Sequence, residues 1–233
     1  NISACDEVWT VSHGAGENLR SLGYQGEYIV MPNGVDFPAG RLPEERVRAV
    51  GEGIDLPDGV ALLLFVGRMM WYKGLRIILD ALKQLKDEGR DFRMVFVGKG
   101  TDGDAIRAYA EELALCDKVF FLAPCYDREI IRAWYCRADL FLFPSTFDTN
   151  GLVVREAAAC GLASVLIAGS CAAEDVTDGQ NGFFIEENAD SMAAMLRRLL
   201  PQRELMRQVG GNAQKEIYIS WEDSIANACR RYE

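Results

Sequence analysis

The stretch that decides the fold reads PSTFDTNGLVVREA over residues 144–157. Residues 140–143 before it predict a buried strand that Pro144 ends, and the residues from about Gly151 predict a helix. Loop amides and the start of that helix then meet at one place, which suits an anionic or hydroxyl-rich ligand. Asp148 and Glu156 stand at the two ends of this loop and helix, where carboxylates can accept hydrogen bonds from sugar hydroxyls. An acidic helix cap with a solvated glutamate is the alternative that the segment leaves open.

A second strand-to-helix turn carries two cations. Residues 61–66 predict a buried strand, and the turn GRMMWYKG at 67–74 leads into apolar residues at helical spacing. Arg68 offers a planar fork and Lys73 a mobile point charge, which together suit a diphosphate whose negative charge grows as it leaves. Either cation alone could be a solvated surface charge. Open α/β sheets bind ligands at the carboxyl ends of their strands, so this position favours a binding role.

These motifs resemble the donor-binding domain of the retaining GT-B nucleotide-sugar glycosyltransferases of family 4. Gly67-Arg68 with Lys73-Gly74 carries the resemblance, together with Asp148 and Glu156 in an acid-x7-Glu frame. Further motifs occur in the family's order along the whole chain: Ser12 before a helix, PNGVD at 32–36, VGKG at 97–100, DGQNG at 178–182 and SWE at 220–222. Each motif is weak alone, whereas the ordered set is specific.

The resemblance implies a role for each matching residue. Arg68 and Lys73 would hold the donor diphosphate, and Glu156 would hold the ribose. Asp148 and the amides of the loop after it would contact the transferred sugar, while a glycine turn would let the backbone approach the nucleotide. The residues assigned to the site, of which Arg68, Lys73, Asp148 and Glu156 form the catalytic set, are Gly67, Arg68, Lys73, Gly98, Gly100, Pro124, Cys125, Asp148, Thr149, Asn150, Gly151, Leu152 and Glu156.

Three departures from the family pattern concern the loops of this site. Asp148 stands where the family usually has Glu, so the carboxylate reaches one methylene less far, and Asn150 replaces a common Phe. The loop version at 149–152 is closer to members that glycosylate lipid or polysaccharide carriers. Residues 161–165 lack the usual proline, and residues 169–171 replace a common double glycine, so we assign no role to Glu174.

Strand and helix patterns alternate along the chain. The expected strands lie at 7–11, 28–31, 61–66, 92–97, 119–122, 139–143, 164–167 and 183–185, and only helices are expected after Ala189. The alternation predicts an α/β fold with a doubly wound, mostly parallel, Rossmann-like sheet. Residues 40–59, rich in Gly, Pro and charge, are expected to be a surface loop or an insertion.

The resemblance also predicts a domain organisation. Residues 1–233 would form one donor-binding domain, half of a GT-B fold, cut from a longer chain whose N-terminal acceptor domain is absent. The start without Met agrees with this expectation. The last helix, around 221–232, would cross back toward the acceptor domain. The isolated chain is therefore expected to be inactive.

Composition limits the partners. The 233 residues carry a formal charge of −10, which argues against nucleic acid and repels an anionic membrane unless the absent domain supplies cations. No run approaches the roughly 20 apolar residues that span a bilayer, and no signal peptide is visible. The seven cysteines show no C-x-x-C pair, which favours free thiols in a reducing cytosol. We expect a cytoplasmic protein, peripheral at a membrane at most.

Three short sequence features could be mistaken for a dinucleotide-binding motif, a metal clamp and a catalytic histidine. Residues 98–103 spell G-x-G-x-x-G and keep an NAD(P)-binding oxidoreductase open, but the acidic residue expected about 20 positions on is missing. Asp102-Gly103-Asp104 mimics a metal clamp and is expected to cap the next helix instead. His13 is expected at the surface beside a helix start. We expect no metal and no resident cofactor, with the nucleotide sugar as co-substrate.

Three hypotheses follow. The chain is the donor-binding half of a retaining glycosyltransferase, an NAD(P)-binding domain, or a sugar-nucleotide-binding domain without catalysis. Thermal protection by a nucleoside diphosphate or by NADH would separate the first two. Only activity after restoration of the N-terminal part would separate the first from the third.

Overall fold

Six parallel strands form the main sheet in the order β5-β4-β3-β6-β7-β8. The computed structural model describes residues 2–232, in which these strands are β3 (Leu62–Val66), β4 (Arg93–Val97), β5 (Val119–Leu122), β6 (Leu140–Phe143), β7 (Ser164–Ile167) and β8 (Phe183–Ile185). Almost every residue of the four central strands is buried. A parallel sheet is covered on both faces, so its strands must be nearly continuous apolar runs.

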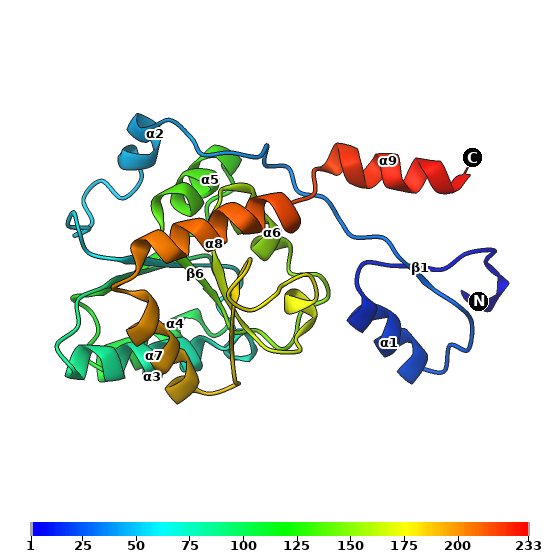
Figure 1. Cartoon of the computed structure of the whole chain (residues 1–233). Coiled ribbons are helices and arrows are strands. Elements are labelled where there is room, and N and C mark those ends of the chain that lie inside the picture. The colour runs from blue at the N-terminus through cyan, green and yellow to red at the C-terminus, as the bar shows by residue number, and fades with distance from the viewer. Residues whose placement is uncertain (1, 233) are drawn as a thin grey trace.

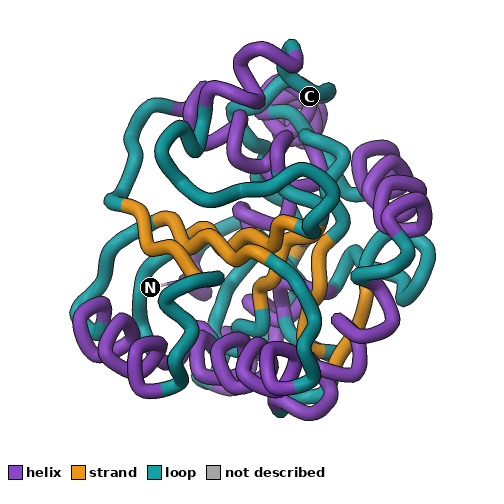
Figure 2. The backbone as a smooth tube through the Cα atoms, turned by 90° about the vertical axis from the view of Figure 1, so that its left-hand side faces the viewer, coloured by secondary structure: helices purple, strands orange, loops and turns teal. Residues whose placement is uncertain are grey.

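Helices cover both faces of this sheet (Figures 1 and 2). They are α2 (Glu44–Ala49), α3 (Leu75–Asp87), α4 (Gly103–Glu112), α5 (Arg128–Arg137), α6 (Leu152–Ala159), α7 (Ala189–Leu199) and α8 (Arg203–Glu216). Figure 1 shows α3, α4 and α7 on one face and α5, α6 and α8 on the other. The predicted doubly wound α/β fold is confirmed.

Two of the predicted strands do not join this sheet. β1 (Trp9–Thr10) and β2 (Ile29–Val30) pair with each other in a separate two-stranded parallel sheet beside α1 (His13–Ser21). The prediction of a single sheet was therefore wrong for them, because an extended segment after β2 carries the chain across to the main body (Figure 1). We call residues 2–31 the N-terminal unit.

The last helix, α9 (Trp221–Tyr232), has the predicted bounds and lies against the N-terminal unit. The rings of Tyr232 and Trp9 are 5.3 Å apart, and Arg231 pairs with Glu7 at 2.7 Å. Ser224 also donates a hydrogen bond to the carbonyl of Pro32 at 2.8 Å. The two ends of the chain therefore pack together, away from the main sheet.

The segment 40–59 is more than the predicted surface loop. It contains α2, whose Val47 is 4% exposed and whose backbone packs against α5. Arg46 of α2 also pairs with Glu129 of α5 at 3.1 Å. The Gly and Pro residues that suggested a loop lie on both sides of this short helix.

The strand order reverses between β3 and β6. β3 pairs with β4 on one side and with β6 on the other, although β6 comes three strands later in the chain. The connections after these two strands therefore leave the sheet on opposite faces and open a crevice at their carboxyl ends. Both motif-bearing turns, at 67–74 and 144–151, lie at this point.

Candidate functional site

A cleft of about 280 Å³ lies at the carboxyl ends of β3 and β6. Its lining residues are Asn33, Val66, Gly67, Arg68, Lys73, Phe143, Asp148, Thr149, Asn150, Gly151, Leu152 and Val153. The tertiary structure thus brings together two segments that lie far apart in the sequence. We call residues 67–74 the cationic turn and residues 144–151 the acidic loop. Asn33, from the PNGVD motif, also lines the cleft although the sequence analysis gave it no role.

The cationic turn rests on the end of β6. Gly74 has φ +74°, and a Cβ there would lie 2.0 Å from the carbonyl oxygen of Pro144. Only a glycine allows both this backbone conformation and this close approach. The turn leaves Arg68 exposed at the cleft, with its guanidinium 5.9 Å from the centre of the Tyr72 ring.

Lys73 is buried and already paired. Its Nζ lies 2.7 Å from Oδ2 of Asp148 and donates a second hydrogen bond to the carbonyl of Phe147 at 3.2 Å. Lys73 is 8% exposed, so this ammonium has little access to water. The two predicted cations therefore differ, since Arg68 has no ion-pair partner within residues 2–232 and Lys73 holds the acidic loop.

Asp148 organises the loop that follows it. Its Oδ1 accepts hydrogen bonds from the amides of Thr149, Asn150 and Gly151 at 2.9, 3.4 and 3.0 Å. Burial raises the pKa of the Asp148 carboxyl, but the hydrogen bonds from Lys73 and from the Gly151 and Asn150 amides outweigh it and hold the pKa below its ordinary value. Asp148 is therefore an anion at neutral pH.

This arrangement changes which amides can reach a ligand. Three of the loop amides that the resemblance assigned to the sugar are occupied by Asp148. The next two, of Leu152 and Val153, begin α6 and have no partner among the described residues. The start of a helix attracts anions, and Leu152 and Val153 both line the cleft. Their two amides are therefore available to bind an anion there.

Glu156 lies inside the body and does not line the cleft. Its Oε1 accepts a hydrogen bond from Arg128 at 2.7 Å, and its Oε2 accepts one from the hydroxyl of Tyr135 at 2.9 Å. Burial, followed by the charge of Glu156, raises the pKa of Tyr135 well above its ordinary value, so the phenol keeps its proton. Each carboxylate oxygen of Glu156 retains an acceptor position.

Four more predicted site residues also lie outside the cleft lining. Cβ atoms at Gly98 and Gly100 would lie 2.0 Å and 2.1 Å from the carbonyl oxygens of Gly67 and Met69, respectively. These glycines therefore let residues 98–102, the turn that follows β4, pack on the cationic turn. This packing explains the G-x-G spacing without a dinucleotide. Pro124 and Cys125 follow β5 at the edge of the sheet. Their contact with a nucleotide stays a prediction.

Asp102 does not cap its own helix, so that prediction was wrong. It stands at the N-cap of α4 without a side-chain bond to it, and its Oδ2 accepts from the amide of Trp71 at 2.9 Å instead. Asp102 thus ties the β4 turn to the cationic turn. Residues 2–232 contain no group of three or more His, Cys, Asp or Glu side chains placed to hold a metal. Independence from metal stays a prediction.

Two residues without an assigned role connect the N-terminal unit to the main body, Ser12 at the acidic loop and Glu174 after β7. The Ser12 hydroxyl donates to the carbonyl of Thr149 at 2.5 Å and caps α1. Glu174, left unassigned above, accepts from the amides of His13 and Gly14 at 2.7 and 2.6 Å. His13 is exposed at the start of α1, as predicted. The sequence marked Ser12 as a helix start but carried no signal for its distant partner.

Comparisons with known proteins identify the family of this chain. Residues 52–216 match the family model of the group 1 glycosyl transferases. D-inositol 3-phosphate glycosyltransferase 2 of Catenulispora acidiphila is 30% identical over 85% of this chain and 48% of its own length. A GDP-mannose-dependent phosphatidylinositol dimannoside mannosyltransferase of Mycobacterium tuberculosis is 28% identical over 85% and 50%.

The fold is also that of solved glycosyltransferases. The Anabaena protein HepE, crystallised with UDP-glucose, superposes with a TM-score of 0.85 at 20% identity, over 98% of this chain and 64% of that one. The chain spans about half the length of the curated relatives it matches. In residues 2–232 no helix is both long and apolar enough to cross a bilayer. The family model covers more than half of the chain, and the protein belongs to the group 1 glycosyl transferases.

Proposed function

We propose that this chain is the donor-binding part of a retaining, metal-independent glycosyltransferase. It would move a hexose from a nucleoside diphosphate sugar to a hydroxyl of a glycolipid or polysaccharide acceptor. The observation that supports this most is the meeting of Arg68, Lys73 and Asp148 in one cleft at the strand-order reversal. The name of one relative, a phosphatidylinositol dimannoside mannosyltransferase, supports a glycolipid acceptor.

The proposed diphosphate position lies between Arg68 and the start of α6. Arg68 supplies an exposed planar fork, and Leu152 and Val153, whose amides are free at the start of α6, line the same cleft. Fixed donors of this kind stabilise the charge that develops on a leaving diphosphate. Arg68, Lys73 and the helix start would neutralise this negative charge themselves, which supports transfer without a divalent ion.

The proposed sugar contact uses one oxygen of Asp148. Oδ1 accepts three amides and is full, whereas Oδ2 accepts only from Lys73 and keeps an acceptor position for a sugar hydroxyl. Lys73 would then hold the loop and share its remaining hydrogen with the donor. This differs from the simpler expectation that both cations serve the diphosphate alone.

The proposed ribose contact uses Glu156. Arg128 and Tyr135 fix the carboxylate from two sides and leave one acceptor position on each oxygen. Val153, one helical turn before Glu156, lines the cleft. A nucleotide that extends from the cleft past Val153 would therefore meet Glu156. HepE was crystallised with UDP-glucose and a relative is named for GDP-mannose, so we propose no particular base.

Ligand binding to the 233-residue chain tests the proposal. We expect UDP or GDP, and their sugars, to raise the melting temperature equally with and without EDTA, and NADH to leave it unchanged. Loss of donor binding in EDTA would contradict the metal-free mechanism, and protection by NADH would contradict the substrate class.

Activity tests the rest of the proposal. We expect no glycosyl transfer from this chain alone, because one side of the cleft cannot exclude water from the sugar. Joining it to the acceptor-binding domain that this proposal requires should restore transfer with retention of the anomeric configuration. Transfer by the chain alone, or an inactive but donor-binding full protein, would contradict it.

A further inference from the structure

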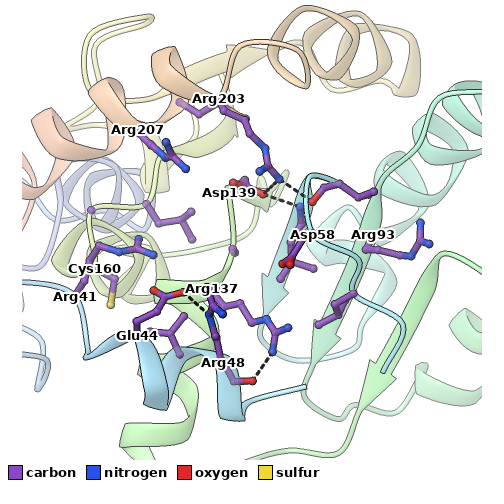
Figure 3. Close-up of a pocket in the computed structure, with 18 of the residues that line it drawn as sticks. Arg41, Glu44, Arg48, Asp58, Arg93, Arg137, Asp139, Cys160, Arg203 and Arg207 are labelled. Carbon is purple, nitrogen blue, oxygen red and sulfur yellow. Dashed lines mark hydrogen bonds and ion pairs between the residues drawn. The ribbon is translucent and has the colours of Figure 1, made fainter. Parts of the chain in front are cut away.

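A pocket of about 750 Å³ lies at the opposite end of the sheet from the donor cleft. Its lining includes Leu62 and Arg93, where β3 and β4 begin, and Asp139, which precedes β6. The segment around α2, the end of α5 and the start of α8 complete its walls (Figure 3). None of the residues assigned to the donor site lines this pocket.

Arginines dominate the charge of this pocket, which we call the arginine pocket. Six arginines line it, from four stretches of the chain, against three acidic residues and no lysine: Arg41, Arg48, Arg93, Arg137, Arg203 and Arg207, with Glu44, Asp58 and Asp139. The whole chain carries a net charge of −10, so this local excess of cations runs against the composition. An excess of this kind raises the local concentration of anions.

Neutral carbonyl groups hold three of these side chains in place. Arg41 donates to the carbonyl of Cys136, and Arg137 donates to the carbonyls of Arg48 and Val50. Arg203 donates to the carbonyl of Val60 at 2.7 Å, besides its bond to Asp139. A carbonyl orients a guanidinium without cancelling its charge, so these groups are fixed and still cationic.

The carboxylates near the pocket neutralise only part of the set. Glu44 pairs with Arg48 at 2.9 Å, and Asp139 pairs with Arg203 at 2.9 Å. Arg93 is bound outside the pocket by Asp55 and Asp91. Arg41 and Arg137 have no ion-pair partner in the part of the chain that the structure describes.

Burial makes the charge on Arg137 costly. Burial lowers the pKa of Arg137 below its ordinary value, and the nearby charge of Asp58 only partly opposes this. Arg207, by contrast, is exposed and lies 3.9 Å from its nearest acidic partner, Glu204. A bound anion would offset the burial cost of the charge on Arg137 and would pair with Arg207.

We propose that the arginine pocket is a second binding site, for a small molecule that carries two or more phosphate groups. Arginine forks bind phosphate oxygens in pairs, which distinguishes them from lysine point charges. The volume falls within the range of about 300–1,000 Å³ typical of small-molecule sites and exceeds what a single phosphate fills. The ligand occupies a site separate from the donor cleft, at the amino ends of the strands.

Calorimetry with sodium tripolyphosphate tests this site on the 233-residue chain. The Arg68→Ala variant removes the anion-binding fork of the donor cleft. Tripolyphosphate binding that remains in this variant therefore reports the second site. In this background, Arg48→Gln with Arg207→Gln should weaken tripolyphosphate binding by about tenfold or more, as expected for lost hydrogen bonds between charged groups. Both side chains are exposed and anchor no backbone carbonyl, so the melting temperature should stay unchanged.

Arg20→Gln with Arg90→Gln is the matched control, because it removes the same two charges at exposed ion pairs outside the pocket. It should leave tripolyphosphate affinity within twofold of the background. Equal weakening by Arg20→Gln with Arg90→Gln would reduce the effect to net charge and overturn the proposal. Loss of all tripolyphosphate binding in Arg68→Ala alone would also overturn it, as would citrate binding as tightly as tripolyphosphate.

Discussion

The two ends of the six-stranded sheet present cations in different ways. At the carboxyl ends, the donor cleft holds one exposed cation, Arg68, and one cation, Lys73, that a carboxylate neutralises at 2.7 Å. At the amino ends, the arginine pocket is larger, and carbonyl groups hold Arg41 and Arg137. Short sequence motifs build the first site, whereas residues from six separate stretches of the chain line the second.

The two sites differ in how far the positions of their charged side chains can be predicted from the sequence. In the donor cleft, each functional side chain lies a few residues after a strand, so its position follows from the strand pattern. In the arginine pocket, no two segments share a motif, and only tertiary packing makes neighbours of residues 41 and 207. The following predictions test this contrast, beginning with the largest expected effect.

Replacing Gly74 by Ala should destabilise the chain most, because the cleft depends on a backbone contact. Gly74 and Gly89 both have φ +74°, but a Cβ meets Pro144 only at Gly74. We expect Gly89→Ala to cost about 1–2 kcal/mol from its left-handed conformation alone. Gly74→Ala should cost roughly 3 kcal/mol or more, because the turn must also move. Urea denaturation measures both, and equal losses would contradict the contact.

Replacing Arg68 by Ala should weaken nucleoside diphosphate binding by about 1.5–3 kcal/mol, roughly tenfold or more, with no change in melting temperature. The reason is that Arg68 is exposed and unpaired among residues 2–232, so its loss leaves no buried partner. The double variant Arg48→Gln, Arg207→Gln should leave this affinity unchanged. Calorimetry of all three proteins with UDP and GDP decides whether the two ends bind independently.

Replacing Asp148 by Asn should cost about 1–3 kcal/mol of stability at neutral pH, because it leaves the buried Lys73 without its anion. Although burial raises the pKa of Asp148, Lys73 and the loop amides lower it below 3.8, its ordinary value. A lowered folded pKa contributes stability that is complete above the unfolded pKa and is lost as the pH falls through the folded pKa.

The stability gap between wild type and Asp148→Asn should therefore be constant above about pH 5 and should close as the pH falls below about 4. Urea denaturation across this range measures it. Asp104→Asn is the control, since Asp104 is exposed and has no ion pair in the described part of the chain. A gap that stays constant into acid would mean that the carboxylate charge is not what holds Lys73.

Replacing Glu156 by Gln should have the smallest effect, a loss of a few-fold in affinity. The glutamine oxygen can still accept from Arg128, and the amide nitrogen can donate to the Tyr135 hydroxyl, so the charge and the acceptor positions of one oxygen are lost. We expect UDP and UDP-sugar to lose the same factor, because both carry the ribose. Asp148→Asn should instead reduce mainly the extra affinity that the sugar adds. Equal losses for both ligands in both variants would contradict this division of roles.

The strand ends carried most of what the sequence could predict. Buried apolar runs at 61–66 and 140–143 fixed the two central strands, and the residues after them supplied the cleft lining. The sequence could not show that Asp148 would take three loop amides, because side-chain geometry within a loop has no periodic signal. It also missed the separation of β1 and β2, since a short strand pattern does not reveal which sheet it joins.

The sequence alone predicted the family, the alternating α/β fold and the two motif-bearing turns that follow buried strands. These properties follow from local patterns, since hydrophobic period and turn residues act within a few positions. Only the tertiary structure decided that Lys73 is neutralised by Asp148, that Glu174 caps α1, and that six arginines converge at the far end of the sheet. Long-range contacts of this kind depend on how whole elements pack, because packing brings together residues that no local pattern relates.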